Sequence, residues 1–211
     1  LTTGDGGMLT TNDEKMARKF RLWRQHAMNV SDVARHGGSS VVFESYEELG
    51  YNYRMTDVQA AMGRVQLERL NSIVARRREL AASYEELLSG VEGIITPIER
   101  SNMKSNWQSY CIRLNEGINS KNVMQTLLDE GVSTRRGIMC AHREAAYAKE
   151  PWTWIGKETG SSPILIESER AQDQSILLPM FHEMTAIDQQ HVADTLKRSI
   201  ISLSADTIKA R

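Results

Sequence analysis

Cysteine is scarce in this sequence of 211 residues, which contains two cysteines, Cys111 and Cys140. Two are too few for a disulfide framework or a cysteine-rich metal site, so we expect two reduced thiols. Long hydrophobic runs are also lacking: no stretch approaches the roughly 20 apolar residues that a membrane-spanning helix needs. No signal peptide is recognisable at the start of the sequence, and we expect a cytoplasmic protein that does not enter a membrane.

An excess of either charge is lacking as well. The sequence has 26 lysines and arginines against 27 aspartates and glutamates, which gives a formal net charge of −1. A field this weak does not recruit nucleic acid or an anionic membrane surface. Hydrophobic residues make up 40% of the chain and charged residues 25%, which is ordinary for a soluble globular protein. The length allows one domain, or one domain and part of another.

Two capping boxes mark the expected starts of helices in the first half of the chain. Thr11 and Glu14 predict a helix to about residue 27, and Thr56 and Gln59 predict a longer one to about residue 88. Before the first helix, a glycine-rich turn at residues 4–7 lies between strand-like residues and predicts a hairpin.

The long helix has two distinct sides in the sequence pattern. Val58, Met62 and Val65 recur at helical spacing and predict an apolar side. The three arginines at 76–78 suggest a nucleic-acid site at first sight. Because they lie among glutamates in a near-neutral chain, we interpret them as a solvated face with local ion pairs.

After residue 93 the pattern is a mixture of strands and helices. Strands are predicted at 94–97, 107–114, 132–134 and 176–179, and helices at 120–128 and 168–174. Ser120 is the predicted cap of the first of these helices. A last helix is predicted to begin at a Thr185 cap and to end near residue 202. Its inward-facing residues are expected to be Ile187, Val192, Leu196 and Ile200.

Two motifs about fifty residues apart resemble one known family. The first is Leu1-Thr2-Thr3-Gly4-Asp5-Gly6-Gly7, and the second is Tyr51-Asn52-Tyr53-Arg54-Met55, followed by Thr56-Asp57-Val58-Gln59. In this order they resemble the DegT/StrS family of pyridoxal-phosphate-dependent sugar aminotransferases. The resemblance is strong over residues 1–90 and weaker, but in the same order, to residue 200.

The resemblance implies a fold and a reaction. The implied fold is α/β, of the aspartate-aminotransferase type, which is fold type I of the pyridoxal-phosphate enzymes. Residues 1–55 are expected to be the end of the cofactor-binding large domain, residues 56–90 a connecting helix and residues 91–211 the small C-terminal domain. The implied reaction transfers an amino group, with glutamate as the expected donor, to a nucleotide-linked keto-sugar for cell-surface polysaccharide biosynthesis. Pyridoxal phosphate is the electron sink in such chemistry.

The same resemblance implies four site residues. Asn52 is expected to bind the cofactor phosphate of the other subunit, which requires at least a homodimer. Arg54 and Tyr53 are expected on the substrate side of this shared site. His142 follows a segment similar to one that borders the family's substrate pocket, although Cys140-Ala141-His142 replaces the usual Pro-Leu-His. An amide, a guanidinium and phenols before a helix N-terminus suit an anion, whereas without the resemblance residues 51–54 read as a packed loop and His142 as a structural residue.

The catalytic residue of the family falls outside this sequence. The cofactor-bearing lysine lies two residues before the position of Leu1, and Lys15 and Lys19 lie in the helix after the turn, where they do not replace it. The chain is therefore expected to be inactive by itself. Two alternatives stay open: a sugar dehydratase of the same family, in which histidine replaces that lysine, and a stand-alone binding or dimerisation module without catalysis.

We predict that the 211-residue chain does not attach pyridoxal phosphate at one particular lysine. The physical reason is that neither Lys15 nor Lys19 occupies the strand position that carries the cofactor in the family. The chain would be incubated with pyridoxal phosphate, reduced with borohydride and analysed by peptide mass spectrometry. Scattered, substoichiometric modification is expected, and a stoichiometric adduct at one lysine would contradict the prediction.

Overall fold

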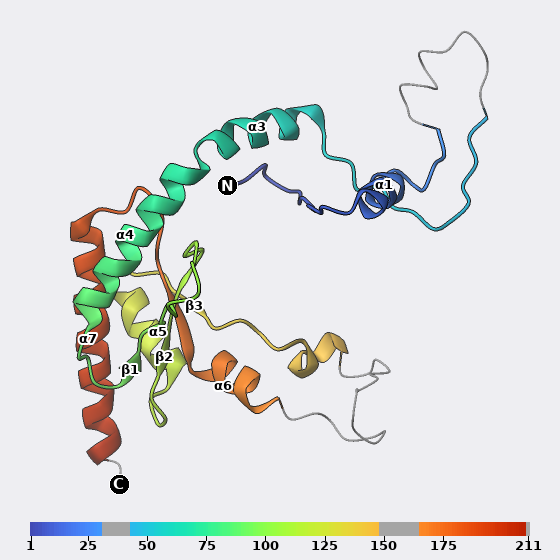
Figure 1. The fold of residues 1–211 in the computed structure, drawn as a ribbon. Coiled ribbons are helices and arrows are strands. Elements are labelled where there is room, and N and C mark those ends of the chain that lie inside the picture. Colours follow the sequence, from blue (N-terminus) through green and yellow to red (C-terminus); the bar gives the residue numbers. More distant parts are fainter. Residues whose placement is uncertain (31–42, 148–164, 210–211) are drawn as a thin grey trace. The chain divides into compact units, whose positions relative to one another are not determined.

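The computed structural model describes residues 1–30, 43–147 and 165–209, with side chains up to residue 203 (Figure 1). The chain divides into two compact units, Leu1–Asn71 and Ser72–Arg211. The domain boundaries expected after residues 55 and 90 stay a prediction.

The first unit begins with an extended segment and helix α1, Glu14–Trp23. The Asp13 carboxylate caps α1, because it accepts hydrogen bonds from the backbone N–H groups of Lys15 (2.7 Å) and Met16 (3.2 Å). The prediction of a Thr11 cap was wrong: the Thr11 hydroxyl accepts from the backbone N–H of Asp13 and shapes the turn before the helix. The predicted hairpin was also wrong, because residues 1–11 contain no strand.

The second helix of this unit, α3, spans Asp57–Glu68 and begins at the predicted capping box. The Thr56 hydroxyl accepts from the backbone N–H of Gln59 (3.3 Å), and the Gln59 side-chain oxygen accepts from the backbone N–H of Thr56 (3.0 Å). The predicted long helix is two helices, because α3 ends before Arg69 and α4 occupies Leu70–Leu88. The apolar residues on α3 are exposed, as the 75% exposed side chain of Val58 shows.

A four-stranded antiparallel sheet forms the centre of the second unit. Its strands are β1 (Ile94–Ile95), β2 (Tyr110–Leu114), β3 (Arg135–Arg136) and β4 (Ser175–Leu178), in the spatial order β1-β2-β4-β3. The central pair is β2 and β4, with Tyr110 opposite Leu178 and Ile112 opposite Ile176. Side chains alternate between the two faces of a strand, and Tyr110, Ile112 and Leu114 are buried on one face.

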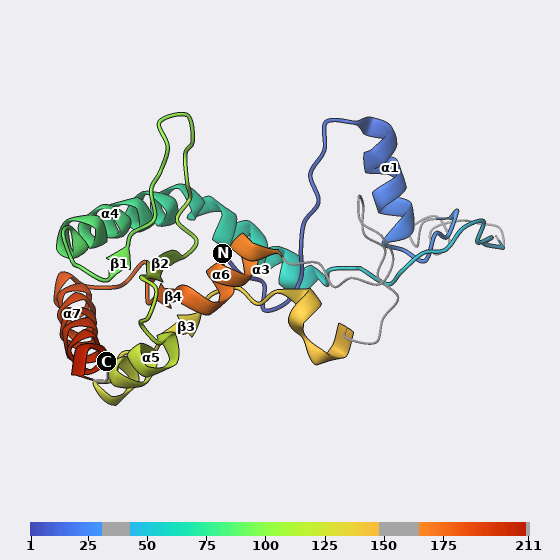
Figure 2. The same ribbon diagram turned by 90° about the horizontal axis from the view of Figure 1, so that it is seen from below.

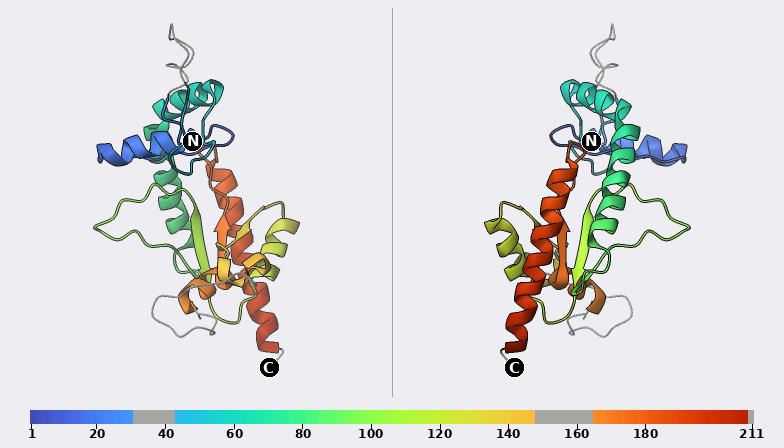
Figure 3. Two further views of the ribbon diagram at one scale, coloured as in Figure 1. Left: turned by 90° about the vertical axis from the view of Figure 1, so that its right-hand side faces the viewer. Right: turned by 90° about the vertical axis from the view of Figure 1, so that its left-hand side faces the viewer.

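Three helices bury that face of the sheet. They are α4, α5 (Ser120–Asp129) and α7 (Ala186–Lys209), and the hydrophobic core contains buried side chains from each of them. Figure 3 shows α4 and α7 running alongside the strands. Helix α5 is capped by Asn119, whose side chain accepts from the backbone N–H of Asn122. The predicted Ser120 cap was therefore wrong by one residue.

The second unit also contains the segments that carry its candidate site. Two short 3₁₀ turns, η1 (Ala141–Arg143) and η2 (Ala145–Tyr147), follow β3. Helix α6 (Ile166–Gln174) runs directly into β4. Because no residue separates α6 from β4, the position of the central strand sets the position of this helix. None of the helices within the described ranges is both long and apolar enough to cross a membrane.

The arginines at 76–78 bind backbone carbonyls, contrary to the predicted solvated face. Residues 96–109, between β1 and β2, extend away from the sheet (Figure 2). Arg77 donates to the carbonyls of Trp107 (2.7 Å), Gln108 and Met180 (3.1 Å), and Arg78 donates to that of Ser105 (2.6 Å). Arg76 makes the local ion pair that was expected, with Glu79. The arginines therefore hold the end of this loop against α4.

Helix α7 begins at the predicted Thr185 cap. The Thr185 hydroxyl accepts from the backbone N–H of Asp188 (3.1 Å), and the Asp188 carboxylate accepts from the backbone N–H of Thr185 (2.9 Å). Val192, Leu196 and Ile200 are buried as expected, with at most 4% of their surface exposed. Ile187 is 82% exposed, so its predicted inward position was wrong.

Ile200 and Ile187 provide a matched pair of substitutions on one helix. Ile200→Ala should lower the free energy of unfolding by about 2–5 kcal/mol, because it removes a buried side chain and leaves a cavity. Ile187→Ala should change it by no more than about 0.5 kcal/mol, because the side chain is in solvent. Urea unfolding followed by tryptophan fluorescence measures both. Equal destabilisation by the two variants would show that the face of α7 that packs on the sheet is assigned incorrectly.

Candidate functional site

The segment 51–54, which contains the predicted cofactor residue Asn52 and the predicted substrate residues Tyr53 and Arg54, is fixed against the end of α1 by backbone hydrogen bonds. The N–H of Tyr51 donates to the carbonyl of Trp23 (2.7 Å), and the N–H of Tyr53 donates to that of Arg24 (2.9 Å). The backbone at Gly50 lies very close to the backbone of Ala27. A Cβ at Gly50 would lie only 2.1 Å from the Ala27 nitrogen. Glycine is therefore needed at this position.

Within this segment, the structure brings Asn52 and Arg54 into direct contact. Arg54 Nε donates to the side-chain oxygen of Asn52 (3.0 Å). This bond orients the amide, and its nitrogen makes no hydrogen bond to any described residue. The rings of Tyr51 and Tyr53 are stacked, 5.1 Å apart, and the Tyr53 side chain is 71% exposed. An amide donor and a guanidinium thus stand together on the surface of the first unit.

The glycine-rich turn lies against the start of α3, directly after this segment. The side-chain nitrogen of Gln59 donates to the carbonyl of Asp5 (3.2 Å). A Cβ at Gly6 would lie 3.1 Å from the methyl carbon of Met55. The two sequence motifs, although fifty residues apart, therefore meet within one compact unit.

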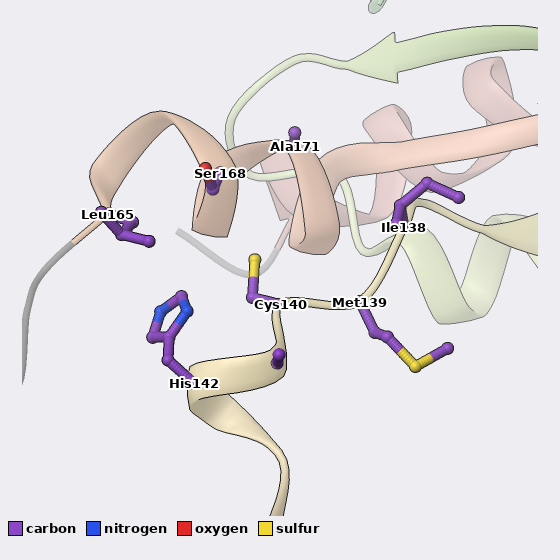
Figure 4. Close-up of a pocket in the computed structure, with 8 residues that line it drawn as sticks. Ile138, Met139, Cys140, His142, Leu165, Ser168 and Ala171 are labelled. Carbon is purple, nitrogen blue, oxygen red and sulfur yellow. The ribbon is translucent and has the colours of Figure 1, made fainter. Parts of the chain in front are cut away.

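His142, the fourth predicted residue, belongs to the second unit and lines a surface hollow of about 470 Å³ (Figure 4). In Figure 4 the segment that leads to η1 forms one wall and the first turns of α6 form the other. The described residues that line the hollow are Ile138, Met139, Cys140, Ala141, His142, Leu165, Ser168 and Ala171. Most of these side chains are apolar.

Glu169 on α6 is the partner of His142. The two side chains meet with His142 Nε2 2.9 Å from Glu169 Oε1, and the histidine side chain is 9% exposed. The same carboxylate oxygen accepts from the backbone N–H of Leu165 (3.2 Å). The hydrogen bond from His142 lowers the pKa of the Glu169 carboxyl below its ordinary value of 4.5.

Two more contacts join the segment 140–143, which forms the wall opposite α6, to that helix. Arg143 Nη1 lies 2.9 Å from both carboxylate oxygens of Asp173. The backbone N–H of Cys140 donates to the side-chain oxygen of Gln172, which is buried. Sequence reasoning missed Glu169, Gln172 and Asp173 because these residues are about thirty positions from their partners, and no local pattern connects them.

The chemistry available in the hollow is that of one imidazole with a fixed partner. The Cys140 thiol lines the hollow together with His142, but no hydrogen bond joins them, so they do not form the nucleophile–base pair of a cysteine hydrolase. Across the described ranges, no group of three or more His, Cys, Asp or Glu side chains is arranged to hold a metal ion. Hydrogen bonding and proton transfer at the imidazole are what this arrangement supports.

The fold itself is that of known sugar aminotransferases, fold type I of the pyridoxal-phosphate enzymes. The chain is similar to the aminotransferase TlmJ from Streptoalloteichus hindustanus, with a TM-score of 0.78 and 28% identity over 96% of this chain and 49% of that one. It is also similar to the sugar aminotransferase CalS13 from Micromonospora echinospora, with a TM-score of 0.74 and 25% identity over 94% of this chain and 48% of that one.

The sequence comparison agrees with the structural one. Residues 1–197 match the DegT/DnrJ/EryC1/StrS aminotransferase family, and the chain belongs to this family. The spore coat polysaccharide biosynthesis protein SpsC from Bacillus subtilis is 28% identical to it over 201 residues, which are 93% of this chain and 50% of SpsC. The chain thus spans about half the length of the relatives it matches.

The lowered pKa of Glu169 predicts a specific acid dependence of stability. The ionised carboxylate is favoured in the folded state, so its contribution is present above about pH 4.5 and is lost as the pH falls through the lower folded-state pKa. Glu169→Gln should therefore lose less stability than the wild type between about pH 6 and about pH 3.

Glu167→Gln is the matched control, because this substitution also removes one negative charge from α6. Glu167 pairs at the surface with Arg170. The pH profile of melting temperature of Glu167→Gln should follow that of the wild type more closely than the profile of Glu169→Gln does. Identical profiles for Glu169→Gln and the wild type would contradict the assigned ion pair.

Proposed function

We propose that this chain is the C-terminal part of a pyridoxal-phosphate-dependent enzyme that transfers an amino group from an amino acid, glutamate, to a nucleotide-linked keto-sugar. The observation that carries the proposal is the Asn52–Arg54 pair, in a chain of an aminotransferase family and in the same compact unit as the glycine-rich turn. The similarity to SpsC, a spore coat polysaccharide biosynthesis protein, supports a product used in a cell-surface polysaccharide. We place the enzyme in the cytoplasm.

The residues present fit the phosphate group of the cofactor. The amide nitrogen of Asn52 is on an exposed residue and has no partner among the described residues. A hydrogen bond from an amide to a charged phosphate is stronger than one to a neutral acceptor. Arg54, which donates a hydrogen bond to the side-chain oxygen of Asn52, adds a positive charge next to this amide. Because Asn52 faces outward from its own unit, we propose that the phosphate it binds is held by the second subunit of a homodimer.

Each of the predicted residues then has a role of its own. Bound pyridoxal phosphate supplies the electron sink for the proton shift at the amino-bearing carbon. Asn52 donates to the phosphate and fixes its position, and Arg54 presents its guanidinium to the anionic part of a substrate. The exposed ring of Tyr53, held by stacking on Tyr51, contacts the substrate on the same side. His142 hydrogen-bonds the sugar in the hollow of the second unit.

The role of Asn52 is tested in the enzyme with a complete large domain. Asn52→Ala removes a hydrogen bond to a charged acceptor, which costs about 1.5–3 kcal/mol. The dissociation constant of the cofactor should therefore rise by about one to two orders of magnitude. Asn52→Asp keeps an acceptor for Arg54 but replaces the amide donor with a negative oxygen, so it should weaken cofactor binding at least as much.

Asn29→Ala is the control for this experiment, because Asn29 is also a hydrogen-bonded asparagine of the first unit. Its side chain binds Ser45 through two hydrogen bonds, of 2.6 and 3.0 Å. Asn29→Ala should lower the melting temperature and leave the affinity for the cofactor unchanged. The role assigned to Asn52 fails if Asn52→Ala lowers the melting temperature but binds the cofactor with wild-type affinity.

A further inference from the structure

The described residues that line the hollow beside His142 have mostly apolar side chains. Among the described residues that line it there is no lysine, arginine, aspartate or glutamate. The nearest arginine in sequence, Arg143, is bound to Asp173 and does not line the hollow. Ser168 adds a hydroxyl, while Ile138 and Met139 add exposed apolar surface. Such a lining suits an uncharged ligand better than a phosphate or a carboxylate.

The Glu169 carboxylate determines which nitrogen of His142 carries the proton. An ionised carboxylate only accepts hydrogen bonds, so the nitrogen 2.9 Å from it, Nε2, must bear a hydrogen. The carboxylate is itself held in place, because it accepts from the backbone N–H of Leu165 at the start of α6. When the ring is neutral, Nδ1 is then an acceptor. Nδ1 makes no hydrogen bond to a described residue.

We propose that Glu169 is a positioning residue, which holds His142 in the Nε2–H tautomer so that Nδ1 accepts a hydrogen bond from a hydroxyl group of a sugar ring in the hollow. The apolar side chains around it contact the C–H faces of the ring. The identity of the ligand as a sugar rests on the proposed function, whereas the assignment of Glu169 to the tautomer of His142 does not.

The tautomer is measured first, on the 211-residue chain without any ligand. Long-range proton–nitrogen NMR spectra distinguish Nε2–H from Nδ1–H imidazole, and the signals of His142 are identified by their loss in His142→Gln. The wild type should show the Nε2–H tautomer at a pH where the ring is neutral. Glu169→Gln should show a mixture of both, because an amide can either accept or donate.

Asp173→Asn is the matched control for the tautomer. It weakens the neighbouring contact between α6 and the wall of the hollow but leaves the His142–Glu169 contact in place. It should therefore retain the wild-type tautomer. An Nδ1–H tautomer in the wild type, or an unchanged Nε2–H tautomer in Glu169→Gln, would overturn the role of Glu169, whatever the outcome of the aminotransferase test.

The ligand is tested next with two probes, methyl glucoside and inorganic phosphate. Methyl glucoside, added up to its solubility, should shift the Nδ1 signal of His142, and phosphate should not. Glu169→Gln should raise the dissociation constant of the sugar by about 2- to 10-fold, the effect of losing one neutral hydrogen bond. A shift with phosphate alone, or with neither probe, would overturn the sugar contact but would leave the proposed aminotransferase activity to the Asn52 experiment.

Discussion

The guanidinium of Arg77 holds together the segments on which the second unit depends. It reaches the carbonyls of Trp107 and Gln108 just before β2, and the carbonyl of Met180 just after β4. Both places lie at the same end of the antiparallel β2–β4 pair, where Tyr110 is opposite Leu178. Desolvation lowers the pKa of Arg77, but a guanidinium remains charged in proteins. A planar group with five donors is suited to joining several carbonyls that secondary structure leaves unpaired.

The candidate site of the second unit is supported by the β2–β4 strand pair. The β2–β4 pairing fixes β4, and α6 continues into β4 without a loop. Glu169, Gln172 and Asp173 lie on this short helix and bind, respectively, His142, Cys140 and Arg143. The orientation of one imidazole therefore depends on a chain of contacts that starts at the sheet. A rigid support of this kind is what a hydrogen-bonding group needs to hold a fixed direction.

Local signals in the sequence predicted some helix starts correctly and others wrongly. The capping box at Thr56 and the cap at Thr185 were confirmed, whereas Asp13 caps α1 in place of Thr11 and Asn119 caps α5 in place of Ser120. A strand was predicted at 107–114, and β2 occupies Tyr110–Leu114 of that range. The arginines at 76–78 were misinterpreted because their partners are backbone carbonyls some thirty to a hundred residues away. Every residue has a backbone carbonyl, so the sequence does not show which of them an arginine binds. Ile187 lies in the first turn of α7, where the helical period alone does not fix which residues reach the core.

The same distinction separates the two groups of candidate residues. Asn52 and Arg54 are two positions apart, so the sequence showed them as a pair, and the structure adds that the guanidinium orients the amide. His142 and Glu169 are 27 positions apart, and the sequence showed one without the other. The first group offers donors and a positive charge, which suit an anion, whereas the second offers an acceptor among apolar walls, which suits a neutral ring. The nucleotide-linked sugar and the phosphate-bearing cofactor that we propose contain both kinds of chemistry.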